Sequence, residues 1–576
     1  MLKRRAELDK LFPHWERKTI ARHFDDQASQ FSERVLVETL QERWTYRQIL
    51  EEANRVARGL MTLGVKKRNH VALLMGNYVE FIIYKIAIAK IGAVCIPINT
   101  MSQQEDISFV LKNGDASVLV MNDRLNRQEY AEFLYNLYPE IRTSETCNRL
   151  NIETLPLLRH IITVSKTQTA YDGMISHEQL LQLADETTEM ERVQRQEQSE
   201  FPEDVSDIIF TSGTTGDPKG VMLTHDNFLR CSYSSVYTRG YADGTKFVSG
   251  LPLYHVFAYT EGFLTSTFVG GTFIPQVQFN PRETFQLIET FRANVWLGVP
   301  SMCVALLNHA DLPIFDLSSL YGVMCAAANA PIALWERCRN ELKVTDVYTG
   351  YGMTEVSASS MMTMVGDSLE TVATRIGTLK PSGAAGAKEL NGYAAIYKVV
   401  DLETGEDLPP GKDGELVCRG PIVTKGYYKN PLETAKVIDK DGWLRTGDVG
   451  ILHEDGYFEF TGRTKEMYKI SGENVSPKSV EDVISKFPKV NQVHVVGIPD
   501  KHAGEVGAAC IELKEGVECS RTEIIEYCRK HLAKYKIPRH ILFIKVHELP
   551  MTSTGKIQKF KLAQFIQERL NLTDGV

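Results

Sequence analysis

The chain has 576 residues, of which 43% are hydrophobic and 24% are charged, and its formal net charge is −8. This length exceeds what one ordinary hydrophobic core can hold, so we expect at least two domains. The average composition excludes a disordered or fibrous protein, and the mildly acidic balance argues against nucleic acid as the main partner.

The ten cysteines are scattered singly, and the sequence contains neither a C-x-x-C pair nor a disulfide framework. We therefore expect reduced, mostly buried thiols in a cytoplasmic protein. The basic start of the chain lacks the apolar region of a signal peptide. The most apolar stretch, Glu80–Ile98, contains Lys85 and Lys90 and predicts a buried helix followed by a strand, with no transmembrane segment. Peripheral membrane contact and a homodimer remain open.

The first part of the chain alternates between strand and helix patterns. His70–Asn77 predicts a strand, Tyr78–Ile91 a helix and Gly92–Ile98 a second strand, an order typical of a parallel sheet. A second series begins at Asp207, after a polar stretch that is expected to be a solvated connector. Within that series, Pro281–Pro300 predicts another helix followed by a strand.

From Val399 the pattern changes to short β segments separated by turns, which predicts a small β-barrel or meander. A compact α/β module is expected to follow, with one helix capped by Ser476 and started by Pro477. We therefore predict a large N-terminal domain over residues 1–463 and a small C-terminal domain over residues 464–576.

The stretch TSGTTGDPKGVMLTH at Thr211–His225 is rich in glycine and hydroxyl groups and follows an apolar run. It departs from the Walker A pattern, because Pro218 replaces a glycine and Gly220 replaces the final serine or threonine. Hydroxyls, glycines and a lysine still suit a polyphosphate, although an ordinary flexible turn can share this composition. The candidate phosphate-binding residues are Thr211, Ser212, Gly213, Thr214, Thr215 and Lys219.

Four later stretches hold further candidates for nucleotide binding. In TGYGMTEVS, Tyr351 suits contact with a base, Thr354 a phosphate and Glu355 a magnesium ion. In WLRTGDVG, Asp448 is a carboxylate suited to two ribose hydroxyls.

The other two stretches are basic. TGRTKEMYKISGENVSP contains Arg463 and Lys465 at the expected domain boundary, and PMTSTGKIQK places Lys556 on a glycine turn. Taken singly, each of these residues could equally be an ordinary loop, turn or surface residue.

Together and in this order, the five stretches resemble those of the adenylate-forming superfamily. This superfamily comprises acyl-CoA synthetases, adenylation domains of nonribosomal peptide synthetases and firefly-type luciferases. The resemblance extends from Trp44 to Lys559, nearly the whole chain. It implies an α/β fold in which two α/β subdomains and a small β-barrel form a large N-terminal domain, followed by a small mobile α/β C-terminal domain.

The resemblance also implies a two-step reaction. A carboxylate attacks the α-phosphate of MgATP to give an acyl-adenylate and pyrophosphate, and a thiol, usually that of coenzyme A, then displaces AMP. Because both reactants of the first step are anions, we expect charge neutralisation and positioning to matter more than acid–base chemistry.

Roles follow from the resemblance for each candidate. The glycine-rich loop orients the β- and γ-phosphates, while Tyr351 stacks on adenine, with the loop around Ala328 and Asn329 along the other face. Thr354 contacts the α-phosphate and Glu355 binds Mg²⁺. The sequence AAANAPI replaces a more usual Gly-Ala-Pro form, so the adenine contacts stay open in detail.

By the same resemblance, Asp448 and Arg463 hold the ribose, and Lys556 stabilises negative charge in the first step only. Lys465 matches the hinge about which the C-terminal domain rotates, and Gly472 lines the thiol channel after that rotation.

His255 matches a gate beside the acyl pocket, with a buried structural histidine as the alternative. Gly352 stands where acetate- and propionate-activating relatives carry Trp, so the resemblance implies an open pocket floor. The neighbouring residues, Tyr259 and Phe263 among them, are apolar or aromatic and are expected to line the pocket, with plain core residues as the alternative. The resemblance therefore favours a medium- or long-chain fatty acid or an aryl acid. Glu261 keeps an amino-acid substrate open.

The acceptor is less narrowly defined. The chain shows no appended carrier domain, which favours coenzyme A. The alternative is an acyl-AMP ligase that transfers the acyl group to a separate carrier protein or an amine. A luciferase-like oxygenase or a non-catalytic relative is a third hypothesis, against which Lys556, Glu355 and Asp448 argue. The segment Ile376–Ile396 is looser than the tight run usual before the barrel and stays unassigned.

Overall fold

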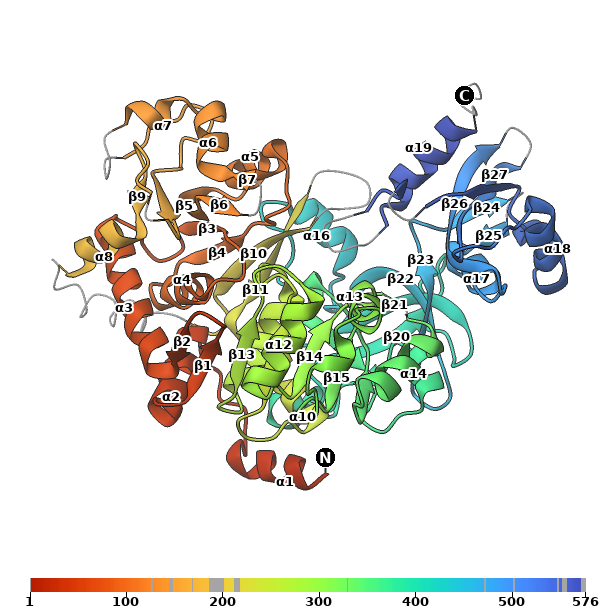
Figure 1. Ribbon diagram of the computed structural model, residues 1–576, viewed down its shortest axis with the longest axis horizontal. Helices are drawn as coiled ribbons and strands as arrows, with labels where there is room; N and C mark the ends of the chain where they lie inside the picture. The colour runs from red at the N-terminus through yellow and green to blue at the C-terminus, as the bar shows by residue number, and fades with distance from the viewer. Residues whose placement is uncertain are drawn as a thin grey trace. The chain divides into compact units, whose positions relative to one another are not determined.

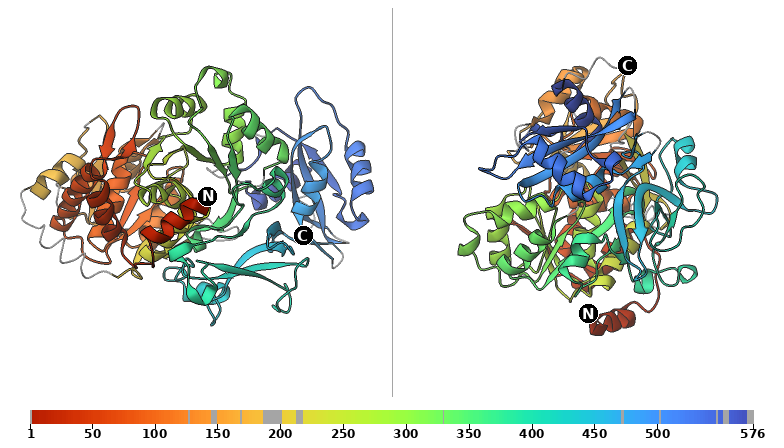
Figure 2. Two further views of the ribbon diagram at one scale, coloured as in Figure 1. Left: turned by 90° about the horizontal axis from the view of Figure 1, so that it is seen from below. Right: turned by 90° about the vertical axis from the view of Figure 1, so that its right-hand side faces the viewer.

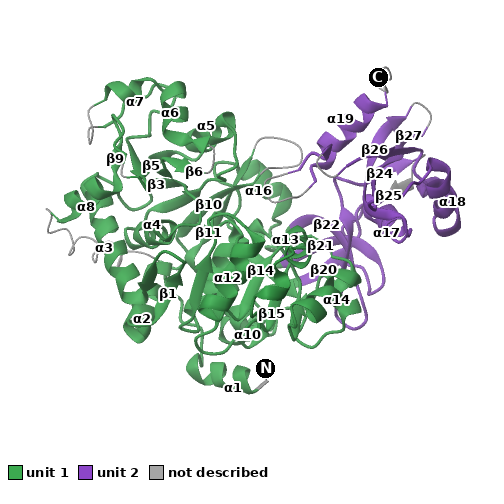
Figure 3. Ribbon diagram, viewed as in Figure 1, with its two compact units in different colours: residues 1–213, 217–396, 419–444 green, residues 214–216, 397–418, 445–576 purple. Residues whose placement is uncertain are grey.

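The computed structural model describes residues 2–125, 128–144, 149–167, 169–185, 201–211, 218–328, 330–470, 473–500, 503–545, 548–551 and 557–570. The chain divides into two compact units, which are coloured separately in Figure 3. Unit 1 comprises residues 1–213, 217–396 and 419–444, and unit 2 comprises residues 214–216, 397–418 and 445–576. The expected boundary after Arg463 falls inside unit 2 and stays a prediction.

The first sheet of unit 1 has seven strands in the order β16-β15-β14-β12-β13-β1-β2. Neighbouring strands run parallel, except for the antiparallel edge pair β1–β2. The strand β1 joins this sheet beside β13, with Val37 next to Phe273. The strands are β1 (Val35–Glu38), β2 (Arg43–Thr45), β12 (Lys246–Ser249), β13 (Thr272–Pro275), β14 (Val295–Gly298), β15 (Gly322–Cys325) and β16 (Asp346–Tyr348).

The second sheet also has seven strands, in the order β11-β10-β4-β3-β5-β8-β9. Only the edge pair β10–β11 is antiparallel. The predicted β-α-β unit is confirmed, since β3 and β4 are parallel and flank a helix. The strands are β3 (His70–Leu74), β4 (Val94–Pro97), β5 (Ala116–Asn122), β8 (His160–Val164), β9 (Ile175–Ser176), β10 (Val205–Thr211) and β11 (Lys219–Thr224).

The helix in that unit, α4 (Val79–Lys90), is apolar on nearly every side, and all its residues except Glu80 are buried. Its two lysines are buried because each has a carboxylate partner: Lys85 pairs with Asp207, and Lys90 Nζ lies 2.8 Å from Asp25 Oδ1. Among the residues that the structure describes, no helix combines the length and apolar character needed to cross a membrane.

The other helices of unit 1 begin where the sequence supplies caps. Thr45 and Gln48 form a capping box at α3, and Asn280 caps α12, which starts with Pro281. In Figure 1, α12 and α13 lie in front of the first sheet. The longer helices are α1 (Leu2–Leu11), α2 (Ile20–Phe31), α3 (Tyr46–Thr62), α5 (Gln104–Asn113), α6 (Tyr130–Leu137), α8 (His177–Asp185), α10 (His225–Arg239), α12 (Pro281–Phe291), α13 (Pro300–Leu307), α14 (Ile332–Glu341) and α16 (Pro431–Val437).

The N-terminal helix α1 contacts the C-terminal end of α10, and it is the red helix beside the N mark in Figure 2. Arg4 Nε donates to the carbonyl of Tyr241 at 2.8 Å, and Arg5 Nε donates to that of Tyr237 at 2.9 Å. The last carbonyls of a helix lack internal partners, so Arg5, which also bonds the carbonyl of Thr238 at 2.6 Å, satisfies groups that α10 leaves open, while Tyr241 lies just beyond that helix.

Each sheet of unit 1 has its own hydrophobic core. The first sheet packs Trp296 against helices that contribute Phe285 and Trp335. The second packs Leu119 against helices that contribute Val110 and Leu134. A small antiparallel sheet of β17 (Gly350–Met353), β18 (Ala358–Met362) and β19 (Thr378–Leu379) also belongs to unit 1.

Unit 2 contains a four-stranded sheet in the order β20-β21-β22-β23, in the region where short β segments were predicted. A second sheet has the order β25-β24-β27-β26, with β28 beside β27. The strands are β20 (Ile396–Val400), β21 (Asp413–Arg419), β22 (Leu444–Leu452), β23 (Phe458–Arg463), β24 (Tyr468–Ile470), β25 (Glu473–Val475), β26 (Val490–Asp500), β27 (Gly504–Leu513) and β28 (His540–Phe543). The helices are α17 (Pro477–Ile484), α18 (Arg521–His531) and α19 (Lys559–Arg569).

The predicted start of α17 is confirmed, with Ser476 at the N-cap position and Pro477 in the first turn. The capping bond itself is absent, since the Ser476 hydroxyl donates to the carbonyl of Thr461 at the end of β23 instead. The nine described cysteines are free thiols, and only Cys519 is not fully buried.

Candidate active site

Several candidate residues follow the carboxyl ends of strands in the first sheet. His255 comes after β12, Ala328 after β15 and Tyr351 after β16. Together with β14, which lies between β12 and β15, these strands run parallel, so their carboxyl ends meet at one edge of the sheet. Crevices outside such edges are where open α/β sheets bind ligands. Ala328 is exposed in the loop after β15, and a residue that contacts adenine must be accessible in this way. Asn329 lies outside the described residues.

The hairpin β17–β18 holds three of the nucleotide candidates. Tyr351 lies in β17 opposite Met361 of β18 and is 8% exposed. Thr354 and Glu355 form a short 3₁₀ helix, after which Ser357 adopts a positive φ of 66°. A left-handed serine is uncommon, and such conformations concentrate at functional sites. This turn sends the chain back along β18.

The carboxylate of Glu355 is held in place by its surroundings. It is 7% exposed, and its Oε1 accepts a hydrogen bond from the Tyr427 hydroxyl at 3.0 Å. Its backbone carbonyl accepts one from the amide of Thr424 at 2.8 Å. Burial and the negative charge of Glu355 both raise the pKa of Tyr427, which therefore stays a hydrogen-bond donor. A carboxylate oriented in this way is suited to bind a hard cation.

Only the two ends of the glycine-rich loop are described. Thr211 ends β10 and lies opposite Lys219, the first residue of β11, so the loop joins two antiparallel strands. The ammonium of Lys219 pairs with Glu433 and lies 5.0 Å from the centre of the Tyr427 ring. The hydrogen bond with Lys219, aided by Lys436, lowers the pKa of Glu433 to about 2. Four candidates lie outside the described residues: Ser212, Gly213, Thr214 and Thr215.

His255 is half-buried and stands just before an eight-residue π-helix, η1 (Phe257–Leu264). Its partial exposure is compatible with a gate, which stays a prediction. The expectation that Tyr259 and Phe263 line the acyl pocket is wrong. Tyr259 and Phe263 are only 2% and 0% exposed, because η1 turns them into the core, where Phe263 stacks on Phe24.

The interpretation of Gly352 also changes. A Cβ at this position would lie 1.5 Å from the carbonyl oxygen of Ala358, so the close approach of β17 to β18 requires glycine. The absence of a side chain therefore gives no support for an open pocket floor. Glu261 is likewise unavailable for a substrate amino group, since its carboxylate is fully buried and pairs with Arg239.

Unit 2 brings together the two residues predicted to hold ribose. Asp448 of β22 lies opposite Arg463 of β23, and Arg463 Nε is 3.1 Å from Asp448 Oδ1. Asp448 is 6% exposed, with its amide bonded to the Thr446 hydroxyl at 3.1 Å. The carboxylate is thus fixed in direction, although the ribose itself remains a predicted ligand.

The exposed Lys465 lies in the turn between β23 and β24. A short exposed connection of this kind can absorb a backbone rotation, so its hinge role stays a prediction. Lys556 and Gly472 lie outside the described residues, and their roles stay predictions too.

Comparison with known proteins finds two family matches along the chain. The family described as AMP-binding enzyme matches residues 24–428, and its C-terminal domain matches residues 479–556. YngI of Bacillus subtilis, provisionally named an acyl-CoA synthetase, is 33% identical over 96% of this chain and 98% of its own. A mitochondrial protein of Danio rerio named medium-chain acyl-CoA ligase is 32% identical over 92% of this chain and 85% of its own.

Among solved structures, the anthranilate CoA ligase AuaEII in complex with anthranoyl-AMP has a TM-score of 0.79 and 25% identity, covering 97% of this chain and 98% of its own. The match with the AMP-binding family extends over well more than half of the chain and includes the hairpin that carries Tyr351 and Glu355. The chain is therefore a member of the AMP-binding enzyme family, within the adenylate-forming superfamily.

Proposed function

We propose that the protein is an ATP-dependent acid–thiol ligase. It converts a carboxylic acid, through an acyl-adenylate, into an acyl-CoA thioester and releases AMP and pyrophosphate. The observation that carries this proposal is the buried Glu355 carboxylate, oriented by Tyr427 on a hairpin that also holds Tyr351 and Thr354. The names of the relatives, acyl-CoA synthetase and medium-chain acyl-CoA ligase, support the acceptor thiol.

The residues of the hairpin suit the first step. Tyr351 offers an aromatic ring for adenine, and Thr354 a half-buried hydroxyl for the α-phosphate. Lys219 can exchange its partner Glu433 for a phosphate, since both side chains are partly exposed at 27%. Such groups lower the barrier by holding two anions together and by countering their charge.

The residues present also fit a magnesium ion. Among the described residues, no three His, Cys, Asp or Glu side chains gather as a metal site. A cation at Glu355 would therefore complete its shell with phosphate oxygens and water, as Mg²⁺ commonly does. When bound, it would supply positive charge to the phosphates, while Tyr427 keeps the carboxylate facing them.

For the acid, we propose the medium- to long-chain fatty or aryl class. The argument rests on the resemblance and on the relatives, one named a medium-chain acyl-CoA ligase and one an anthranilate CoA ligase. His255, just before η1, and Phe257, the first residue of η1, are half-buried, so an acid could reach both side chains. The cytoplasmic location remains a prediction.

The decisive test is pyrophosphate release over a panel of carboxylic acids with Mg²⁺ and ATP, each with and without coenzyme A. We expect release that depends on a fatty or aryl acid and turns over repeatedly only when coenzyme A is present. A single burst that coenzyme A cannot relieve would instead identify a carrier protein or an amine as acceptor. No acid-dependent release from any acid would refute the proposal.

A further inference from the structure

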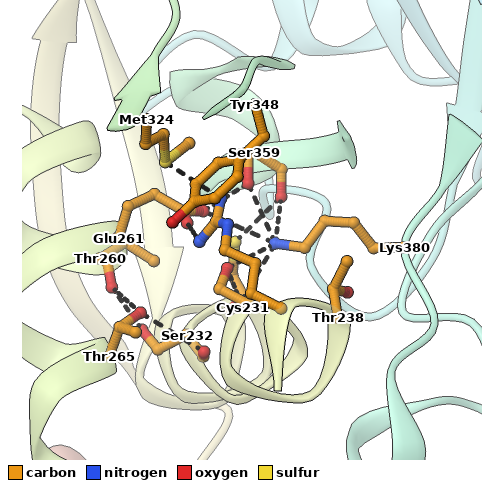
Figure 4. A network of polar contacts seen from close by, with 12 residues as sticks. Cys231, Ser232, Thr238, Thr260, Glu261, Thr265, Met324, Tyr348, Ser359 and Lys380 are labelled. Carbon is orange, nitrogen blue, oxygen red and sulfur yellow. Dashed lines mark hydrogen bonds and ion pairs between the residues drawn. The ribbon is translucent and has the colours of Figure 1, made fainter. Parts of the chain in front are cut away.

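A buried network of charged side chains lies between η1 and the nucleotide hairpin, and Figure 4 shows it from close by. Arg239, the last residue of α10, donates from Nη1 to Glu261 Oε2 at 2.9 Å. The second oxygen of Glu261 accepts from the Ser359 hydroxyl and lies 3.6 Å from Lys380 Nζ. The three charged side chains are at most 4% exposed.

Lys380 completes the network and comes from the segment Ile376–Ile396, which the sequence left unassigned. Its ammonium donates to the Ser235 hydroxyl at 2.7 Å, to the Ser359 hydroxyl at 3.0 Å and to the Ser359 carbonyl at 2.9 Å. Four elements therefore meet here: α10 through Ser235 and Arg239, η1 through Glu261, β18 through Ser359, and the chain after β19 through Lys380.

The charges hold one another in their ionised forms. Burial alone would raise the pKa of Glu261, but the positive charges of Lys380 and Arg239 outweigh it and lower the pKa to about 2. Ionised groups taken out of water are costly unless they are fully paired, so movement of any one partner is strongly penalised. The network fixes the relative positions of the elements that contribute to it.

Two of these elements reach the proposed substrates. Ser359 lies opposite Gly352 on the hairpin whose turn contains Thr354 and Glu355. Glu261 lies in η1, which follows His255, and a π-helix is rare and occurs often at functional sites. Neither Glu261 nor Ser359 is exposed beyond 6%, so both act on substrates only through the backbone that they hold.

A second buried contact ties η1 to the strand that leads into the glycine-rich loop. Tyr259 of η1 lies beneath the ammonium of Lys85, which is 4.2 Å from the centre of its ring. Lys85 in turn pairs with Asp207 of β10. The π-helix is thus joined on one side to the hairpin and on the other to the phosphate-loop strand.

We propose that Glu261 and Ser359 are positioning residues that hold the acid-side helix η1 against the nucleotide-side hairpin β17–β18. Because of this link, the choice of acid and the placement of Thr354 and Glu355 depend on each other. The inference rests on the proposed function, since it concerns how that site discriminates between acids. It assigns a role to Lys380, whose segment the sequence left unassigned.

The test compares Ser359→Ala with the matched control Ser235→Ala. Both remove one hydroxyl that bonds Lys380, but only Ser359 connects to the hairpin. The measured quantity is the ratio of kcat/KM for two accepted acids of different length, in pyrophosphate release. This ratio does not depend on the fraction of active enzyme, so a loss of folded protein alone leaves it unchanged.

We expect Ser359→Ala to change the ratio on the order of fivefold and to raise the KM for ATP, while Ser235→Ala keeps both within about twofold. Glu261→Gln, which removes the charge and keeps the shape, should change the ratio in the same direction. Circular dichroism identifies any variant that fails to fold. If Glu261→Gln fails to fold, the ratio measured for Ser359→Ala still tests the positioning role.

The outcomes separate the two proposals. If the wild-type chain shows no acid-dependent release, the proposed function fails. If it is active but Ser359→Ala leaves the ratio unchanged, or Ser235→Ala changes it equally, the positioning role is overturned.

Discussion

At the scale of single residues, the half-reaction carried by Lys556 can be tested directly. A lysine that counters charge only in the first step should be needed for adenylate formation but not for the attack of the thiol. We expect Lys556→Ala to lower pyrophosphate release roughly 100-fold or more, in the range found when one stabilising donor is removed. Thioester formation from supplied acyl-AMP should stay within a few-fold of wild type.

The exposed Lys561, which follows soon after Lys556 in the sequence and lies in α19, offers a matched control, since Lys561→Ala also removes one positive charge. It should leave both half-reactions unchanged. Equal loss of both half-reactions in Lys556→Ala would remove the assigned role.

The sequence indicated the neighbourhood of Asp448 and Arg463, but it did not indicate the buried network around Lys380. The resemblance assigned Asp448 and Arg463 to one ribose site, and the two residues do face each other across two strands, while ribose binding itself stays a prediction. The network around Lys380 was not found, because one lysine in an irregular segment gives no sign of the buried carboxylate it will meet. A signal was present in FAYTEGFL, where a single carboxylate interrupts an apolar run.

At the scale of elements, the hairpin β17–β18 depends on its glycine. A Cβ at Gly352 would lie 1.5 Å from the Ala358 oxygen, so even Gly352→Ala must push the two strands apart. We expect this variant to raise the KM for ATP, because Tyr351 and Thr354 move with β17, and to lower the thermal unfolding midpoint.

Gly352→Trp should then lose activity toward every acid tested. A shift in preference toward acetate, with a normal KM for ATP, would contradict this account and restore Gly352 as part of the pocket floor. Steady-state kinetics over the acid panel distinguishes the two results.

Most regular elements were predictable because their signals are local. The helix α12, the first proline of α17, and the strand and helix around α4 follow from neighbouring residues alone. The π-helical winding of η1 was not predictable, since its periodicity resembles that of any buried helix. Its packing against charged groups distant in sequence sets which side chains face the core, and so Tyr259 was wrongly expected in the pocket.

At the scale of the whole molecule, two buried histidines predict sensitivity to acid. Burial lowers the pKa of His23 and of His225 to about 3 in the folded chain, against 6.5 when exposed. The unfolded chain therefore binds protons that the folded chain does not as the pH falls from 6.5 toward 3. Each histidine should remove up to about 1.4 kcal/mol of stability per pH unit in that window.

This loss can be measured as the urea midpoint at several pH values between 7.5 and 5. His225 accepts a hydrogen bond from the amide of Ile20 at Nδ1, 3.3 Å away, and an asparagine oxygen can take that place without titrating. His225→Asn should make the midpoint less dependent on pH. A midpoint that is constant in the wild type would contradict the prediction.

Domain limits were the hardest feature to predict from sequence. The spacing of motifs predicts a functional boundary near Arg463, whereas compactness groups residues 397–418 and 445–576 together. Contacts between segments distant in sequence decide compactness, and a single sequence does not show them.

The pairing of β1 with β13 has a consequence for how the chain is made. Val37 finds its neighbour Phe273 only after all the residues between them have been synthesised. At typical ribosomal rates of about 5–20 residues per second, the edge of β1 that does not pair with β2 waits on the order of tens of seconds for β13. During translation, an apolar strand with open hydrogen-bonding groups is therefore available to chaperones, or to other nascent chains, long before the first sheet can close.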